Sequence, residues 1–175
     1  MPFTGYLLAF CRVALGLVFL FSSFGKIRRM GAFVQAIQRF RLLPVSLSAP
    51  AAVLFLCGGC LVVLCLGTGG SFLLPGFGLA LLLLLLFSSA LVSVIIRNIH
   101  ASCNCFGSNE KEVTQTDLWR NAGFILCTLG GCVVWKGAAQ EALSLEAWAV
   151  TGLGALVFVA IWLQLQEIVS LFRQG

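Results

Sequence analysis

Two cysteines, Cys103 and Cys105, stand one residue apart in the longest polar stretch of a very apolar sequence, residues 102–121. Thiols at this spacing close only a small ring, which fits disulfide geometry poorly. Strained disulfides are easier to reduce, and labile disulfides are typical of catalytic or regulatory sites. The spacing therefore predicts a redox-active pair in which one thiolate attacks a partner and the other resolves the mixed disulfide.

Ionisable residues near the pair can tune its chemistry. Arg97, Arg120 and His100, the single histidine of the chain, can stabilise a thiolate or move its proton. The segment TQTD (114–117) resembles a helix capping box, which predicts a helix N-terminus whose dipole also favours a thiolate. We therefore expect His100 to assist catalysis by handling protons.

Two other interpretations of this loop remain open. His100, Cys103 and Cys105 are ligands suited to copper(I) or zinc, although no fourth ligand is evident nearby. The alternative function is thus a copper-handling or assembly factor of the membrane without catalysis. A third interpretation is a structural subunit of a larger complex, in which both cysteines are replaceable.

A second pair, Cys57 and Cys60, has the cysteine-x-x-cysteine spacing of thioredoxin-type redox motifs. On a helix the two positions share a face, so both are candidate catalytic residues that exchange with the loop pair or with a quinone. Alternatively they pack as small residues beside two glycines, because a thiol deep in lipid carries little thiolate. The other four cysteines are expected mainly to pack in the interior: Cys11, Cys65, Cys127 and Cys132.

Arg12 lies inside the first apolar segment, where an ionisable group is costly and indicates a function. It either extends to the near surface or faces the interior, where it can stabilise a thiolate or a quinone oxygen. It is therefore a candidate cofactor-binding residue, although nothing in the sequence specifies a quinone. Lys26 is expected to mark the membrane boundary.

The elements that carry these residues follow from composition. The chain of 175 residues is 60% hydrophobic and only 10% charged, with a mean hydropathy of +1.05. A soluble domain carries about 25% charged residues, so this is an integral membrane protein. Because about 20 apolar residues span the hydrocarbon core, the expected spans are 5–25, 48–67, 72–96, 118–135 and 148–165.

The expected fold class is all-α: one polytopic membrane helix bundle over residues 1–175, with four or five transmembrane helices. Phe33, Ile37 and Phe40 recur at helical spacing among arginines, which predicts a short interfacial helix between the first two spans. Positive charges place the first and third loops in the cytoplasm of a bacterium. Since the basic residues cluster beside the spans, a nucleic-acid partner has no support.

Several short motifs resemble the DoxX and MauE group of small membrane proteins. They are Arg12 before a glycine-rich helix, Phe-Gly-Lys at 24–26, Leu-Leu-Pro at 42–44, Cys-x-Cys-Phe-Gly at 103–107 and Arg-Asn at 120–121. The loop motif is similar to that of the methylamine-utilisation protein MauE. The resemblance implies a redox-associated protein that helps to form or rearrange disulfides in an exported partner, alongside a thioredoxin-like protein.

The resemblance covers about residues 12–134 and has one departure. MauE-like sequences often carry an acidic residue in the second span, whereas residues 51–65 contain none. The exact substrate is therefore not carried over. The expected function is thiol–disulfide exchange with a thioredoxin-like or exported protein, with quinone as a further electron partner. Charge places the loop in the cytoplasm, while an exported partner requires the opposite side.

Overall fold

Each long apolar run of the sequence forms a helix, because a chain in lipid satisfies its backbone polar groups only within such elements. The computed structural model describes residues 2–40, 44–97, 115–138 and 144–164. Its helices are α1 (Pro2–Arg28), α2 (Met30–Arg39), α3 (Val45–Thr68), α4 (Leu73–Ile96), α5 (Gln115–Ala138) and α6 (Leu145–Leu163), with a 3-10 turn at Gly70–Phe72. Five of these helices are long and apolar enough to cross a membrane. The predicted all-α membrane bundle is confirmed.

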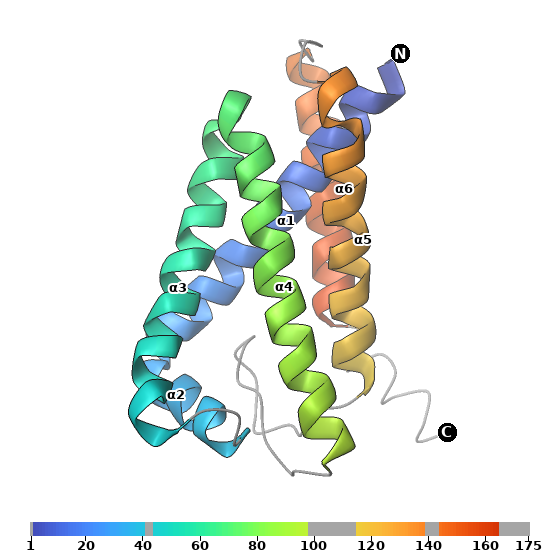
Figure 1. Ribbon diagram of the computed structural model, residues 1–175. Coiled ribbons are helices and arrows are strands. Elements are labelled where there is room, and N and C mark those ends of the chain that lie inside the picture. Colours follow the sequence, from blue (N-terminus) through green and yellow to red (C-terminus); the bar gives the residue numbers. More distant parts are fainter. Residues whose placement is uncertain (1, 41–43, 98–114, 139–143, 165–175) are drawn as a thin grey trace, which may run out of the picture.

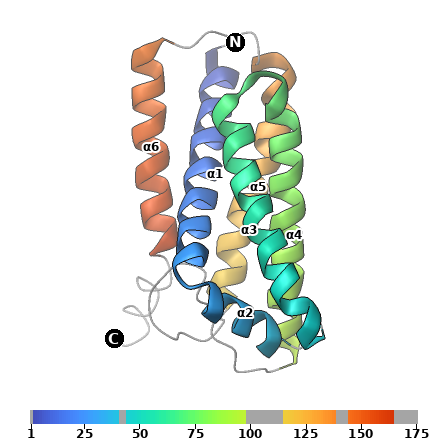
Figure 2. The ribbon, with the colours of Figure 1, turned by 90° about the vertical axis from the view of Figure 1, so that its left-hand side faces the viewer.

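Helix α1 is the centre of the bundle and contacts α3, α5 and α6, while α4 joins α3 to α5. In Figure 1 it crosses behind α4, and Figure 2 shows α6 beside α1 at one edge. Half of the most apolar stretch of α1 is buried, against 17–28% in the other four spans. The serines of α1, Ser22 and Ser23, therefore face protein, whereas most of the surface of α6 faces lipid.

The short helix α2 lies where the sequence predicts an interfacial element, directly after α1. Phe33 and Ala36 are buried against α3, and Arg39 stays exposed at its last turn. This division of apolar and basic residues suits a helix at a membrane surface. The ends of α4 and α6 and the start of α5 lie at this same end of the bundle (Figures 1 and 2). We call it the α2 end.

The connection between α3 and α4 is a tight turn. Gly69 adopts a φ of 77° and Gly70 a φ of 59°, which lie in the left-handed region that glycine tolerates. The Gly69 amide bonds back to the Cys65 carbonyl, and the chain turns at once into α4. This turn fixes α3 and α4 as a hairpin at the end of the bundle opposite α2 (Figure 1).

Some glycines let the spans approach closely, and others do not. A methyl group added at Gly59 would meet Ser23 Oγ of α1 at 2.8 Å, and one at Gly131 would meet the Phe77 ring of α4 at 2.7 Å. Gly130 has nothing within 4 Å. Close packing of helices in lipid therefore requires the glycine at 131 and not its neighbour.

The neighbouring glycines of α5 provide a matched test of this packing. We expect Gly131→Ala to destabilise the protein by about 1–3 kcal/mol, because the new methyl group displaces the buried Phe77 ring. Gly130→Ala should leave stability unchanged or raise it by up to about 1 kcal/mol through helix propensity. Unfolding of both variants in detergent measures the difference, and equal stabilities would contradict this account of the α4–α5 contact.

Candidate functional site

The predicted loop site falls in a segment that the structure leaves out. Cys103, Cys105 and His100 all lie outside the described residues, so their roles stay predictions. The flanking residues are described: α4 ends at Ile96 and α5 begins at Gln115, both at the α2 end. The chain therefore enters and leaves the loop at the same end of the bundle as the interfacial helix.

The start of α5, directly after the cysteine loop, carries a nearly buried ion pair. Arg120 Nη2 lies 2.9 Å from Asp117 Oδ1, one helical turn away, and both side chains are nearly buried. The Arg120 carbonyl accepts a 3.0 Å hydrogen bond from Trp162 Nε1 of α6. The Arg120 guanidinium is thus held in place with part of its charge balanced by Asp117. Arg97, by contrast, is exposed at the end of α4.

Cys57 and Cys60 lie near the middle of α3. Their neighbour Gly59 faces α1 and Gly58 faces Leu83 of α4, whereas Cys57 is exposed and Cys60 is half-buried. A lipid-soluble reagent can therefore reach Cys57 from the membrane. All six described cysteines are free thiols. A redox role for the pair remains a prediction, and it requires a partner on the lipid side of α3.

A different pair of thiols meets inside the bundle. Cys11 of α1 lies beside Cys127 of α5, and Cys11 is only 2% exposed. Sequence reasoning missed this contact because no motif joins residues so far apart; only the pairing of α1 with α5 brings them together. The two thiols lie in the main hydrophobic cluster, as expected for packing cysteines.

Arg12 joins three helices at the end of the bundle opposite α2. Its guanidinium donates hydrogen bonds to the Leu66 carbonyl and, at 2.8 Å, to the Gly67 carbonyl, in the last turn of α3. It also lies 5.2 Å from the centre of the Trp148 ring at the start of α6. Helix C-termini present unpaired carbonyls and partial negative charge, so the arginine stabilises the end of α3. Gly69 leaves room for it, since a side chain there would clash.

The Arg12 contacts predict a measurable effect on stability. Arg12→Leu should lower the free energy of unfolding by roughly 2 kcal/mol, because two carbonyls of α3 lose a charged donor. Arg12→Lys keeps the charge but not the two-pronged geometry, so its loss should be smaller. Arg97→Leu, at an exposed position, is the control. If Arg12→Leu melts at the same temperature as the wild type in detergent, Arg12 does not stabilise the end of α3, and only the predicted cofactor role remains.

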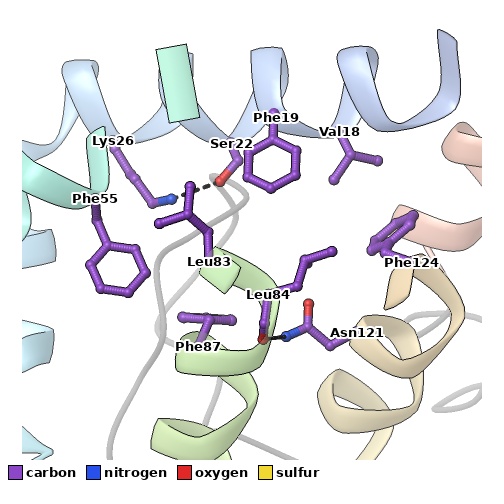
Figure 3. Close-up of a pocket in the computed structure, with 10 residues that line it drawn as sticks. All are labelled: Val18, Phe19, Ser22, Lys26, Phe55, Leu83, Leu84, Phe87, Asn121 and Phe124. Carbon is purple, nitrogen blue, oxygen red and sulfur yellow. Dashed lines mark hydrogen bonds between the residues drawn. The ribbon is translucent and has the colours of Figure 1, made fainter. Parts of the chain in front are cut away.

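A narrow pocket opens among α1, α3, α4 and α5 toward the α2 end, with a volume of about 50 Å³. Figure 3 shows its mostly apolar walls and the few polar groups that point into it. The residues that line it are Val18, Phe19, Ser22, Lys26, Phe55, Leu83, Leu84, Phe87, Asn121 and Phe124. An apolar pocket with a few convergent polar groups is the usual form of a small-molecule site.

Lys26 supplies the charge of this pocket. Its ammonium donates a 2.9 Å hydrogen bond to Ser22 Oγ, one turn deeper in α1, and lies 5.2 Å from the centre of the Phe33 ring of α2. The sequence analysis expected Lys26 only to mark the membrane boundary. The structure shows that its side chain also lines this pocket. The Phe-Gly-Lys motif contained the signal, but the direction of the side chain depends on the packing of α2.

Asn121 closes the pocket from α5. Its amide nitrogen donates to Ser88 Oγ at 2.9 Å and to the Leu84 carbonyl at 3.4 Å, which ties α5 to α4 (Figure 3). The side chain is 7% exposed, so it needs these partners. Polar residues of α1 and α5 thus converge on one apolar space. Within the described ranges, no group of three histidine, cysteine or acidic residues is placed to hold a metal ion.

Comparison with known protein families gives a match over most of the chain. Residues 4–135 match the family described as "Methylamine utilisation protein MauE". The match covers well over half of the chain, from the first turn of α1 to the last turn of α5, and includes Cys103, Cys105 and every residue of the pocket. No curated protein and no solved structure matches significantly.

Proposed function

Because the chain belongs to the family of the methylamine utilisation protein MauE, we propose that this multi-pass membrane protein carries out thiol–disulfide exchange at Cys103 and Cys105. The spacing of these cysteines within the family match is the observation that carries the proposal. The surrounding helices support it, because both ends of the loop lie at the α2 end, where a partner outside the membrane can approach. The membrane is taken to be the cytoplasmic membrane of a bacterium.

The exchange conserves atoms and electrons in two steps. The thiolate of one loop cysteine attacks a disulfide of a thioredoxin-like or exported protein, which forms a mixed disulfide and releases one partner thiolate. The second loop cysteine then attacks the mixed disulfide, so that the loop becomes oxidised and the partner leaves as a dithiol. The same steps in reverse oxidise the partner.

Three further residues have roles that we propose within this scheme. His100 accepts or returns the proton of the attacking thiol, as its position in the loop suggests. Cys57 and Cys60 act as a second dithiol, and the exposure of Cys57 supports a lipid-soluble partner for them. The hydrogen bonds of Arg12 to α3 support a role in holding α1 against α3. Binding of a cofactor by Arg12 is the less supported alternative.

Substitution of the resolving cysteine should trap the partner. We expect Cys103→Ser or Cys105→Ser to accumulate a mixed disulfide, because the remaining thiol attacks but nothing releases the product. Mass spectrometry of the complex purified under acid quench identifies the partner. Alkylation of the thiols before and after reduction shows whether the wild-type pair cycles between two oxidation states.

Matched variants separate this function from the alternatives. Cys11→Ala removes a packing thiol and should leave exchange unchanged, while Cys57→Ser tests the second dithiol separately.

Copper that copurifies with the wild type and is lost in Cys103→Ser would favour a metal-handling factor. Full function of the double variant lacking both loop cysteines would disprove thiol exchange. An impermeant maleimide in intact cells reports which side the loop faces.

A further inference from the structure

A second and larger cavity lies beneath the interfacial helix. It has a volume of about 230 Å³ and is formed by α2, α3 and α4 at the α2 end. Its walls carry no charged residue, and Ser89 is the one polar side chain among them. Aromatic rings from each helix line it, including Phe33 of α2, and Phe40 adds another ring directly after α2. This groove is suited to an apolar chain and not to a hydrated group.

The groove and the Lys26 pocket adjoin. Phe55 of α3 and Phe87 of α4 line both cavities, so their rings stand between the apolar groove and the polar groups deeper in the bundle. Figure 3 shows both rings on the same side of the pocket as Lys26. The two cavities together have an apolar part under α2, near the membrane surface, and a polar part between the helices of the bundle. An amphipathic molecule has the same division.

The Lys26 ammonium has donors left for a ligand. It has three N–H donors, and one is used by Ser22. Across residues 2–40, 44–97, 115–138 and 144–164, no carboxylate lies within ion-pair distance of Lys26, and its other contact is the Phe33 ring. A half-buried ammonium beside aromatic walls gains from a hydrogen-bond acceptor, because burial without one is costly.

We propose that the two cavities together form the binding site of a lipid-soluble quinone. A carbonyl oxygen of the headgroup accepts a hydrogen bond from Lys26 and the ring lies against Phe55 and Phe87. The isoprenoid tail follows the groove under α2 towards the lipid. Aromatic walls favour a flat ring, since offset stacking adds to the gain from apolar burial.

The geometry favours a quinone over the headgroup of an anionic phospholipid. The pocket beside Lys26 has room for a few water molecules or the edge of a ring, but not for a phosphate with its glycerol. The arginines that suit a phosphate, Arg28, Arg29 and Arg39, are exposed outside the pocket. Inside, the polar groups are one ammonium, one hydroxyl and one amide, which match a neutral acceptor.

The quinone gives the proposed exchange an electron acceptor, and only this part of the inference rests on the proposed function. A dithiol that closes to a disulfide loses two electrons and two protons. The quinone takes up both electrons and both protons and leaves as the quinol. Lys26 holds the carbonyl oxygen that becomes a hydroxyl, so it is a positioning residue for the acceptor.

Binding can be measured without any redox partner. Saturable binding of tritiated decylubiquinone to the full chain in phosphatidylcholine nanodiscs should weaken about tenfold or more in Lys26→Met, because a charge-assisted hydrogen bond is lost. Phe87→Ala should weaken it as well. Lys136→Met, at the other end of α5, and Leu82→Ala, on the lipid face of α4, are matched controls that should bind as the wild type does. The tail-free 2,3-dimethoxy-5-methylbenzoquinone should bind more weakly than decylubiquinone, since it leaves the groove empty.

Two outcomes would overturn the site: equal affinity of wild type and Lys26→Met, or displacement of the quinone by phosphatidylglycerol that depends on Lys26. Should Lys26→Met fail to fold, Ser22→Ala and Phe87→Ala carry the test. Cys103→Ser separates the two proposals, because it should bind decylubiquinone normally but fail to reduce it. Quinone binding without reduction by wild type would reject the electron-acceptor role and leave the binding site intact.

Discussion

Hydrocarbon offers no partner to a polar side chain, and this constraint arranges the bundle around α1. The helix carries Arg12, Ser22, Ser23 and Lys26, and the two serines are buried. Arg12 bonds to carbonyls at the end of α3, Ser23 lies against Gly59 of α3, and Lys26 and Ser22 bond to each other beside the pocket that α3, α4 and α5 complete. A helix with these residues is stable in lipid only when other spans surround it. Its central position is therefore a requirement of its sequence.

The two ends of the bundle differ in what these contacts achieve. At the end opposite α2, the Arg12 guanidinium and the Trp148 ring hold α1 to α3 and α6, and a two-glycine turn joins α3 to α4. At the α2 end, the spans enclose a pocket and a groove covered by a helix of only ten residues. The rigid end thus holds the spans while the other end has space for a ligand. The helix ends that flank the cysteine loop, Ile96 of α4 and Gln115 of α5, lie at the end with the space.

Much of the fold followed from the sequence, and the limits have physical reasons. Hydropathy predicted all five spans, because the thickness of the hydrocarbon core sets their length. Some helices extend beyond the expected spans: α1 continues to Arg28 and α5 starts at Gln115, since polar residues extend helices beyond the lipid. Helix α6, by contrast, ends at Leu163, short of the expected residue 165. The interfacial helix was predicted from the spacing of its phenylalanines among arginines, a pattern that is local in sequence.

The site was less predictable because it depends on which helices meet. Gly130 and Gly131 are neighbours in the sequence, yet Gly130 faces open space and Gly131 faces the Phe77 ring. The contact between Cys11 and Cys127 and the direction of Lys26 follow from helix rotation, which a periodic apolar sequence does not specify. The chemistry of Cys103 and Cys105 was assigned from spacing and resemblance, and it stays a prediction.

The Arg12 contact also has a consequence for biogenesis. Its carbonyl partner at Leu66 follows 54 residues later in the chain, so α1 leaves the ribosome and reaches the translocon well before α3 exists. During that interval the guanidinium has to stay hydrated, which keeps the first helix from settling fully into the lipid. Final placement of α1 must therefore wait for the α3–α4 hairpin, and membrane insertion and assembly are one coupled event for this protein.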